Sequence, residues 1–361
     1  MFKIENLENI IAQNKDEFFV TLGCPNYEER SIFCLSNIVD YALRHKTSAL
    51  IKCELLFLKG RKNNNLVLEE LKLQYKNLIK DKLDEIKIAN SNSWHKIDYP
   101  NNFNSRGLIT RLSHRLKKHS TEKEICLHID ISAMPREIVF SLCEAISSWL
   151  ENNIFNIKNV YFSYVAPERY SQLPYAQEVG LLRGFFTGEP ITVEGQQDIR
   201  TVIFPNMTGH ESKLLLDELS QIAHEQKNAI FSQIDADDFL TSMEIMRANQ
   251  ILMEQGDSTQ YYYCSLYDAQ KELLNYFKKE EKERKSISPE SKRLYLVAPF
   301  GSKIMLPISF FVLKKLKEAD TTDRLDIEIC HAQGFQYTSV YSIGAGKIYT
   351  FSLDIKEWKQ K

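Results

Sequence analysis

The sequence predicts an α/β protein with mostly parallel sheets and helices on both faces. Short apolar runs of strand length alternate with longer segments whose apolar residues recur every three or four positions. Several of the apolar runs end in turns rich in Gly, Pro, Asn or Ser that lead directly into a helical pattern. Strands that alternate with helices form βαβ units, and these units place their strands side by side in parallel.

The first half of the chain contains one such series. Its expected strands are apolar runs bounded by polar or turn residues, at 17–23, 49–60, 94–100, 124–130 and 159–167. The expected helices between them are amphipathic, at 30–45, 65–86, 106–119 and 135–152. The stretch "EICLHID" at 124–130 is almost continuously apolar, as is typical of a parallel strand buried on both faces.

A second series begins near residue 200. Its expected strands are 200–206, 228–235, 260–268, 293–301, 324–332 and 347–355, and its expected helices are 211–226, 237–255, 269–286 and one that ends near Glu318. Prolines and glycines interrupt the segment 168–199, which indicates a linker or arm. We therefore expect an N-terminal domain at 1–167, a linker at 168–199 and a C-terminal domain at 200–361.

The two halves resemble each other in the order of their features. Each opens with a strand and a Pro-Asn turn, at Pro25 and at Pro205, before a helix. Later, each has a buried strand followed by a turn with one basic residue, Arg136 or Lys303, at the start of a helix. This similarity predicts two tandem Rossmann-like lobes with mostly parallel sheets and helices on both faces.

Composition excludes several classes of protein. The formal net charge of −2 gives no global basic field for nucleic acid. The seven cysteines are scattered without a C-x-x-C pair, which rules out the usual zinc spacing and argues against a secreted disulfide framework. The N-terminal segment is too charged for a signal peptide, and no apolar run approaches the roughly 18 residues of a membrane span. We expect a cytoplasmic protein that does not bind membranes.

The turns that follow the strands are the candidate binding sites. Ligands of open parallel sheets bind beyond the carboxyl ends of the strands, and a helix N-terminus suits a phosphate group. Three turns place polar or basic residues there: "DISAMPRE" with Asp130, Ser132 and Arg136, "APFGSK" with Gly301, Ser302 and Lys303, and "CPNYEERS" with Asn26, Glu29, Arg30 and Ser31. The turn "FPNMTGHES" supplies Asn206, Thr208, Gly209, His210 and Ser212 in the second half.

These residues also have ordinary structural explanations. Ser, Asp and Pro are common at helix starts as capping residues, and Arg136 could pair with Asp130 or Glu137. No turn matches a Walker A or G-x-G-x-x-G pattern, so the sequence does not predict ATP hydrolysis or a dinucleotide. The acidic run at 235–238 could bind a metal or cap a helix. The basic helix at 106–119 could contact nucleic acid or a partner, or be a solvated face. The Gly-rich loop at 334–349 could be a hairpin or a flap over the pocket.

The stretch "HIDISAMPRE" resembles the CARF-type Rossmann-like sensor domains of prokaryotic defence systems. Those domains carry a D-x-[ST]-x-G-x-[RK]-like turn after a core strand, which Asp130, Ser132 and Arg136 match here, and Ser302 and Lys303 match in part in the second half. Met134 and Pro135 stand where the family has its usual Gly. The resemblance implies a cyclic oligonucleotide as ligand and a signal that passes to an effector, here a separate protein.

We therefore expect a sensor or accessory protein of a bacterial antiviral defence system that binds a nucleotide or another phosphorylated ligand. Mg²⁺ could accompany the nucleotide, and the protein could form a homo-oligomer. Two alternatives are open. A nucleotide hydrolase or transferase would use Asp130 or Glu29 as a base or metal ligand and Arg136 to stabilise phosphate charge. A scaffold subunit would bind a partner protein and no ligand.

Overall fold

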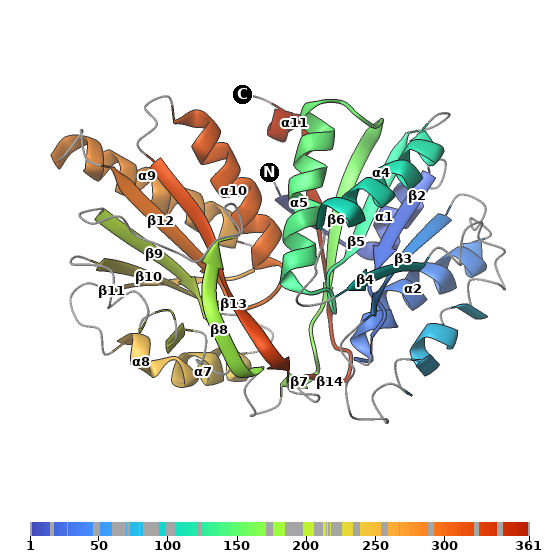
Figure 1. Cartoon of the computed structure of the whole chain (residues 1–361), viewed down its shortest axis with the longest axis horizontal. Coiled ribbons are helices and arrows are strands. Elements are labelled where there is room, and N and C mark those ends of the chain that lie inside the picture. The colour runs from blue at the N-terminus through green and yellow to red at the C-terminus, as the bar shows by residue number, and fades with distance from the viewer. Residues whose placement is uncertain are drawn as a thin grey trace. The chain divides into compact units, whose positions relative to one another are not determined.

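The computed structural model divides the chain into two compact units (Figure 1). Unit 1 comprises Met1–Tyr170 and Ser342–Lys361, and unit 2 comprises Ser171–Tyr341. The structure describes residues 2–14, 18–26, 28–45, 51–59, 70, 73–78, 80–81, 94–98, 105–120, 124–170, 176–184, 198–205, 212–213, 215, 217, 226–233, 239–253, 259–266, 268–287, 292–320, 325–337 and 342–359.

Unit 1 is built on a seven-stranded sheet in the order β1-β15-β6-β5-β2-β3-β4. Its strands are β1 (Phe2–Glu5), β2 (Phe18–Gly23), β3 (Ile51–Lys59), β4 (Trp94–Asp98), β5 (Ile125–Asp130), β6 (Ile157–Val165) and β15 (Ile348–Leu353). The strands from β2 to β6 pair in parallel, and β15 pairs antiparallel with both β6 and β1. The chain first adds β3 and β4 on one side of β2, and then β5 and β6 on the other. The direction of growth therefore switches between β2 and β5.

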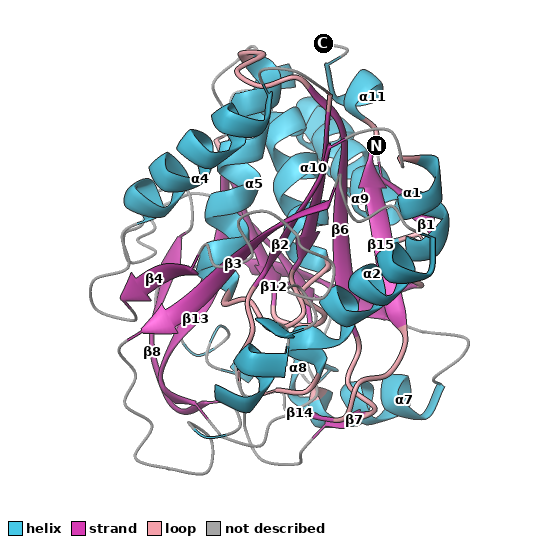
Figure 2. Ribbon diagram, turned by 90° about the vertical axis from the view of Figure 1, so that its right-hand side faces the viewer, coloured by secondary structure: helices cyan, strands magenta, loops and turns pink. Residues whose placement is uncertain are grey.

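Helices cover both faces of this sheet (Figure 2). They are α1 (Leu7–Gln13), α2 (Arg30–His45), α4 (Ser105–Ser120), α5 (Arg136–Glu151) and α11 (Ile355–Lys359). The apolar stripe of α2, with Ile32, Leu35 and Ile38, packs with α1 against alternate strand residues such as Phe19. On the other face, α4 and α5 pack against each other. The predicted helix at 65–86 is helical at 70, 73–78 and 80–81, and its other residues lie outside the described ones.

Unit 2 is built on a six-stranded sheet in the order β11-β10-β9-β12-β13-β8. Its strands are β8 (Ala176–Gly184), β9 (Asp198–Phe204), β10 (Gln226–Gln233), β11 (Thr259–Cys264), β12 (Arg293–Pro299) and β13 (Leu325–Tyr337). All pairs are parallel except β13 with β8. The five parallel strands follow the same order as those of unit 1, so the direction switches between β9 and β12. The prediction of an α/β protein with mostly parallel sheets is confirmed.

Two cores fill unit 2. Its helices are α7 (Phe239–Ala248), α8 (Gln250–Met253), α9 (Ala269–Ile287) and α10 (Met305–Ala319). One core is aliphatic and includes Ile199 and Leu296. In another, aromatic rings stack edge to face, with the Phe277 and Tyr295 centroids 4.9 Å apart. The predicted helix at 237–255 is two helices, which meet at Asn249.

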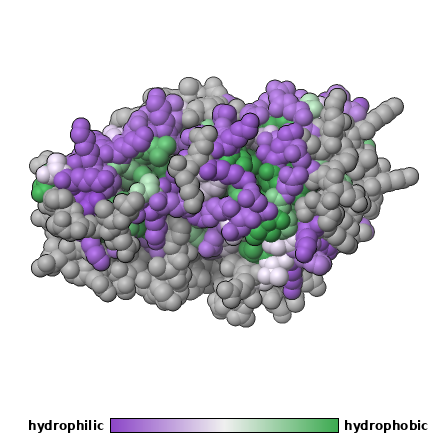
Figure 3. Space-filling model, turned by 90° about the horizontal axis from the view of Figure 1, so that it is seen from above, coloured by the Kyte–Doolittle hydropathy of each residue, from purple (hydrophilic) through white to green (hydrophobic). Residues whose placement is uncertain are grey.

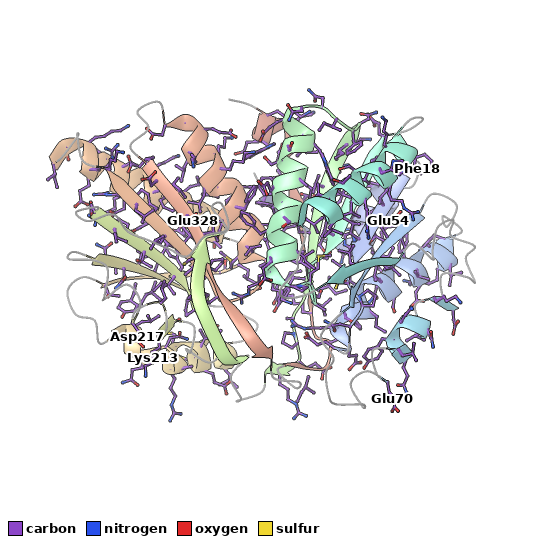
Figure 4. All side chains as sticks on the ribbon, viewed as in Figure 1. Phe18, Glu54, Glu70, Lys213, Asp217 and Glu328 are labelled. Atoms are coloured by element: carbon purple, nitrogen blue, oxygen red, sulfur yellow. The ribbon has the colours of Figure 1, made fainter. Side chains whose placement is uncertain are left out.

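The structure corrects two expectations about domain organisation. The strand expected at 347–355 in the C-terminal domain is β15, and it lies between β1 and β6 of unit 1. The expected linker at 168–199 contains β8, which pairs with β13 in unit 2, and β7 (Arg169–Tyr170), which pairs with β14 (Ser342–Ile343). Gly184 indicates a linker in the sequence, but a Cβ at this position would clash with the side chain of Glu328. Glu328 lies on β13 (Figure 4).

Among the described residues, no helix is both long and apolar enough to cross a membrane.

We predict that Phe351→Ala destabilises unit 1 although residue 351 is near the C-terminus. Phe351 is 2% exposed on β15, and truncation of a buried Phe costs about 3–5 kcal/mol. Hydrogen exchange read by mass spectrometry should show faster exchange in 1–170 and not in 171–341. Phe310→Ala, a matched truncation in α10, should show the reverse pattern. Faster exchange of 171–341 in Phe351→Ala would contradict the division into units.

Candidate functional site

Two predicted turns meet in unit 1 where the strand order switches. β2 ends at Gly23 and β5 ends at Asp130, and the two strands are parallel neighbours. The side-chain amide of Asn26, in the turn after β2, donates a hydrogen bond to the carbonyl of Ala133, in the turn after β5, at 3.2 Å. The structure therefore brings together Asn26 and the Asp130 turn. We call the described residues 23–26, 28–31, 130–136, 165–168 and 344–347 the carboxyl edge of unit 1.

Asn26 also shapes the turn that begins α2. Its Oδ1 accepts the backbone N–H of Glu28 at 2.7 Å, and its own N–H donates to Ser31 Oγ at 3.1 Å. This is the usual way in which an Asn side chain stabilises a turn. Asn26 is 7% exposed, so its role in the structure is to hold the two turns together.

Asp130 and Ser132 form the buried part of the second turn. Ser132 donates its backbone N–H to Asp130 Oδ1 at 3.0 Å and hydrogen-bonds the same oxygen through its hydroxyl. Ser132 Oγ also accepts the N–H of Val165 at 2.9 Å. The Ser132 hydroxyl thus ties the turn after β5 to the end of β6. Neither residue caps α5, whose N-cap is Pro135.

Arg30 connects the turn after β2 to the end of β6. Its Nε lies 2.7 Å from Glu28 Oε2, and its guanidinium also approaches the Tyr164 hydroxyl at 3.4 Å. Arg30 is 3% exposed, so this cation is buried with its partners. Glu29, by contrast, is exposed. Burial and the charge of Glu29 together raise the pKa of Tyr75.

Arg136 is the first residue of α5 and is partly exposed. The N-cap residue Pro135 makes no side-chain cap hydrogen bond. The first N–H groups of a helix have no partner within the helix, and they carry its partial positive charge. A cationic side chain and a helix N-terminus without a side-chain cap therefore coincide at the carboxyl edge of unit 1.

A fourth segment completes the edge. The N–H of Gly346 donates to the carbonyl of Ala166 at 2.8 Å, and the N–H of Ala166 donates to the carbonyl of Lys347 at 3.0 Å. Gly344 has a positive φ of 73°, and a Cβ there would lie 2.5 Å from Glu168 Oε2. The end of the predicted Gly-rich loop is thus a turn fixed to the end of β6. Residues 338–341 of that loop lie outside the described residues.

Unit 2 has a comparable edge of its own. The N–H of Gly301, in the turn after β12, donates to the carbonyl of Phe204 at the end of β9 at 2.7 Å. A Cβ on residue 301 would lie 2.8 Å from the carbonyl oxygen of Pro205, so only glycine permits this approach. The hydroxyl of Ser302 is buried and has no hydrogen-bond partner among the described residues. Lys303 is partly exposed.

The other predicted residues of unit 2 cannot be placed in the same way. Asn206, Thr208, Gly209 and His210 lie outside the described residues, and so do residues 234–238 of the acidic run. Ser212 is buried in a helical position. Within the described part of the chain, no three His, Cys, Asp or Glu side chains gather as potential metal ligands.

A buried polar chain beneath the edge was not predicted from the sequence. His128 Nδ1 lies 2.8 Å from Thr21 Oγ1, and His128 Nε2 lies 2.8 Å from Ser163 Oγ. Ser163 Oγ lies 2.7 Å from Thr350 Oγ1, so the chain spans β2, β5, β6 and β15. Burial lowers the pKa of His128 to about 3, so the imidazole is neutral at physiological pH. In the sequence, these hydrogen-bonded side chains are visible only as single polar residues inside apolar strands.

The buried thiol beside His128 is inert. Cys34 Sγ lies 3.7 Å from His128 Nε2. Burial, and to a smaller extent the charge of Asp130, raises the pKa of the Cys34 thiol well above its usual range. The reactive form of cysteine is the thiolate, so Cys34 is a packing residue.

The comparisons with known proteins give no family. No protein-family model matches this chain, and no curated protein matches it.

We predict that Ser132→Ala destabilises unit 1 by about 2–3 kcal/mol, because it leaves the buried N–H of Val165 without its acceptor. Urea unfolding followed by circular dichroism measures the change. Ser148→Ala is the matched control, because Ser148 is partly exposed and only accepts a 3.4 Å bond from Asn152. It should change stability by less than about 0.5 kcal/mol. Equal effects in both variants would show that Ser132 does not hold the edge.

His128 should make stability depend on pH. Its pKa is about 3 in the folded protein and roughly 6.5 in the unfolded chain. The unfolded state therefore binds more protons between these values, and stability falls as pH falls through that window. The contribution lost between pH 7.5 and 4.5 is roughly 3 kcal/mol, and His128→Gln should lack it. An imidazole signal of His128 that titrates near pH 6.5 in the folded protein would contradict this prediction.

Proposed function

We propose that unit 1 binds a nucleotide or another phosphorylated ligand at its carboxyl edge, and that the protein acts as a sensor or accessory subunit. One observation carries the proposal: the Asn26–Ala133 hydrogen bond joins the two turns at the point where the strand order switches. Ligands of open α/β sheets bind at such points. The N-terminus of α5 and the cation of Arg136 at the same edge fit a phosphate group.

The geometry divides the candidate residues into two roles. Asp130, Ser132 and Asn26 are buried and bonded to neighbouring turns, and so they position the backbone of the edge. Arg30 is buried beside Glu28 and serves the same purpose. Arg136 and Glu29 are the residues that reach solvent. In this proposal Arg136 binds the phosphate, and Glu29 accepts a hydrogen bond from a sugar hydroxyl or a base amine.

The proposal extends to unit 2 as a second Rossmann-like lobe. Its five parallel strands follow the same order as those of unit 1, and its edge carries Gly301, Ser302 and Lys303. The close backbone approach at Gly301 and the buried hydroxyl of Ser302, which lacks a hydrogen-bond partner among the described residues, fit a second phosphate site of the same kind. Lys303 would supply its charge.

The resemblance at Asp130, Ser132 and Arg136 suggests the ligand and the context. CARF-type domains bind cyclic oligonucleotides, so a cyclic oligonucleotide is our first candidate. The proposed context is prokaryotic antiviral defence, with a separate effector protein as the output and self-association as a route for the signal.

Two groups beneath the edge, His128 and Cys34, are unsuited to catalysis. Nucleotide hydrolysis or transfer needs a general base or a nucleophile near the ligand. His128 is neutral but buried within its own hydrogen bonds, and the Cys34 thiol is protonated. Asp130 is buried and its Oδ1 is bonded to Ser132, so the exposed Glu29 is the carboxylate that a nucleotide-processing enzyme would use as its base.

A thermal-shift screen against mono-, di- and cyclic oligonucleotides, with and without Mg²⁺, tests the proposal. A ligand at 100 times its Kd should stabilise the protein by about 2.7 kcal/mol. Arg136→Ala should lower the affinity for that ligand by at least about tenfold, since it removes a charge-assisted hydrogen bond. Arg111→Ala, which removes an exposed arginine from α4, is the matched control.

The outcomes separate the candidate functions. If a ligand stabilises the wild type, Arg136→Ala and Lys303→Ala equally, neither proposed site binds it. Conversion of the nucleotide, seen by chromatography of the mixture and lost in Asp130→Asn, would identify an enzyme. Absence of any hit would favour a scaffold that binds a protein partner.

A further inference from the structure

We propose that the outer face of α9, in unit 2, contacts the phosphate backbone of a nucleic acid. This inference is independent of the ligand site proposed for the carboxyl edges, because it rests on a different element and a different set of side chains.

Lysines form a line along α9. Lys271, Lys278, Lys282 and Lys285 follow the spacing of seven, four and three residues that places side chains on one face of a helix. Lys279 lies beside them, and all five are exposed. At 1.5 Å per residue, the line from Lys271 to Lys285 is about 21 Å long. We call these five residues the lysine line.

The inner face of α9 uses its acidic residues for the fold. Glu280 is 4% exposed, and its Oε2 pairs with Arg200 Nε at 2.9 Å and with an Arg293 nitrogen at 3.2 Å. Glu281 pairs with Arg284 at 2.9 Å, and its other oxygen accepts the hydroxyl of Tyr295 at 3.0 Å.

Asp198 completes this buried cluster by pairing with Arg200 and with Arg293. Three acids thus face three arginines, and the cluster is balanced in charge. Glu280 and Glu281 are committed to arginines, and so they leave the lysine line without neutralisation from these neighbours.

The side chains of the lysine line make no ion pair or hydrogen bond with any other residue in the described part of the chain. Helix stability does not explain it either. Cations favour the last turn of a helix, where Lys285 lies, but they disfavour the first turn, where Lys271 lies. The lysines also contribute nothing to the core, because α9 packs through Leu273, Tyr276 and Phe277.

The chemistry of the line fits a nucleic acid better than a protein or a membrane. Lysines are depleted in the cores of protein interfaces, where aromatic residues and Arg are enriched. A membrane-surface helix needs an apolar face to insert, and the apolar face of α9 is buried in unit 2. Among the residues coloured in Figure 3, hydrophilic ones predominate, with hydrophobic areas between them. A row of point charges suits a row of phosphates.

The contact should be independent of base sequence. Arg284, the arginine of α9, is 2% exposed and paired with Glu281, so it is not available to read a base edge. Lysine contacts to phosphates release counterions, with a slope of log K against log salt of about −0.9 per phosphate on B-DNA. Four or five contacts therefore give a slope of about −4.

Fluorescence anisotropy with labelled 20-base-pair DNA and RNA duplexes of two unrelated sequences tests the proposal in the full chain. Between 50 and 200 mM salt, the wild type should bind both sequences equally, with the slope of about −4. Lys278→Glu with Lys282→Glu should weaken binding at 50 mM salt by more than about tenfold and reduce the slope by about two. Lys80→Glu with Lys356→Glu makes the same charge change at exposed residues of unit 1 and should leave binding unchanged.

Three results would overturn the proposal. The first is no binding by the wild type at 50 mM salt. The second is equal weakening by both double variants, which would indicate net charge and not the lysine line. The third is binding of phosphatidylserine vesicles or polyglutamate at least as tight as duplex binding and lost in the same variant, which would identify another partner. Circular dichroism confirms that both variants are folded. None of these results bears on Arg136 or on nucleotide binding.

Discussion

The hydroxyl of Ser132 is the contact on which the carboxyl edge of unit 1 depends. It bonds Asp130 on its own turn and accepts the backbone N–H of Val165 on the neighbouring strand. Val165 is also next to Ala166, to which the turn at Gly346 is bonded, and its carbonyl is within 3.5 Å of Arg30. One buried side chain therefore links two of the four segments directly, and the other two are bonded to the end of β6 that it holds. Because Asp130, Ser132 and Val165 are buried, loss of one partner leaves another unsatisfied, and such losses are costly.

The rigidity of this arrangement sets what the edge can do. A binding site needs its backbone held in place before the ligand arrives, since ordering on binding reduces affinity. The buried residues Asn26, Asp130 and Ser132 provide that order, while Arg136 and Glu29 remain accessible. Beneath them, the neutral His128 connects Thr21 to Ser163 across the strands. The polar groups under the edge thus stabilise its shape, and its charge lies at the surface.

Much of this arrangement could be predicted from the sequence, because strands and helices are local patterns. The apolar run before Asp130 and the amphipathic pattern of α5 fix both sides of the turn. Partners are not local: nothing in the pattern at 347–355 indicates that β15 crosses back to pair with β6. In the sequence Gly184 indicates a linker, although in the structure its small size permits close packing against Glu328. The sequence predicts that Asp130 ends a strand and that Ser132 lies on the turn after it, but only the structure reveals that Ser132 bonds both Asp130 and Val165.

In unit 2, the charged residues of α9 are divided between an inner face that pairs within the fold and an outer face that is exposed. Periodicity alone separates the inner and outer faces of α9, but the pairing of Glu280 with Arg200 and Arg293 joins residues far apart in the chain. That pairing decides which charges stay in the fold and which remain for a partner. The sequence therefore contains the lysine line, while the structure shows that Glu280 and Glu281, two acids of the same helix, pair with arginines.

The central claim is that the edge between β2 and β5 binds a phosphorylated ligand. Hydrogen exchange by mass spectrometry, with and without a saturating cyclic oligonucleotide, tests it most directly, because it locates the bound ligand on the chain. We predict slower exchange in 24–31 and 130–139, where the two turns and the start of α5 lie, with little change in the remainder of unit 1. Protection confined to other segments of unit 1, with these two unchanged, would contradict the account.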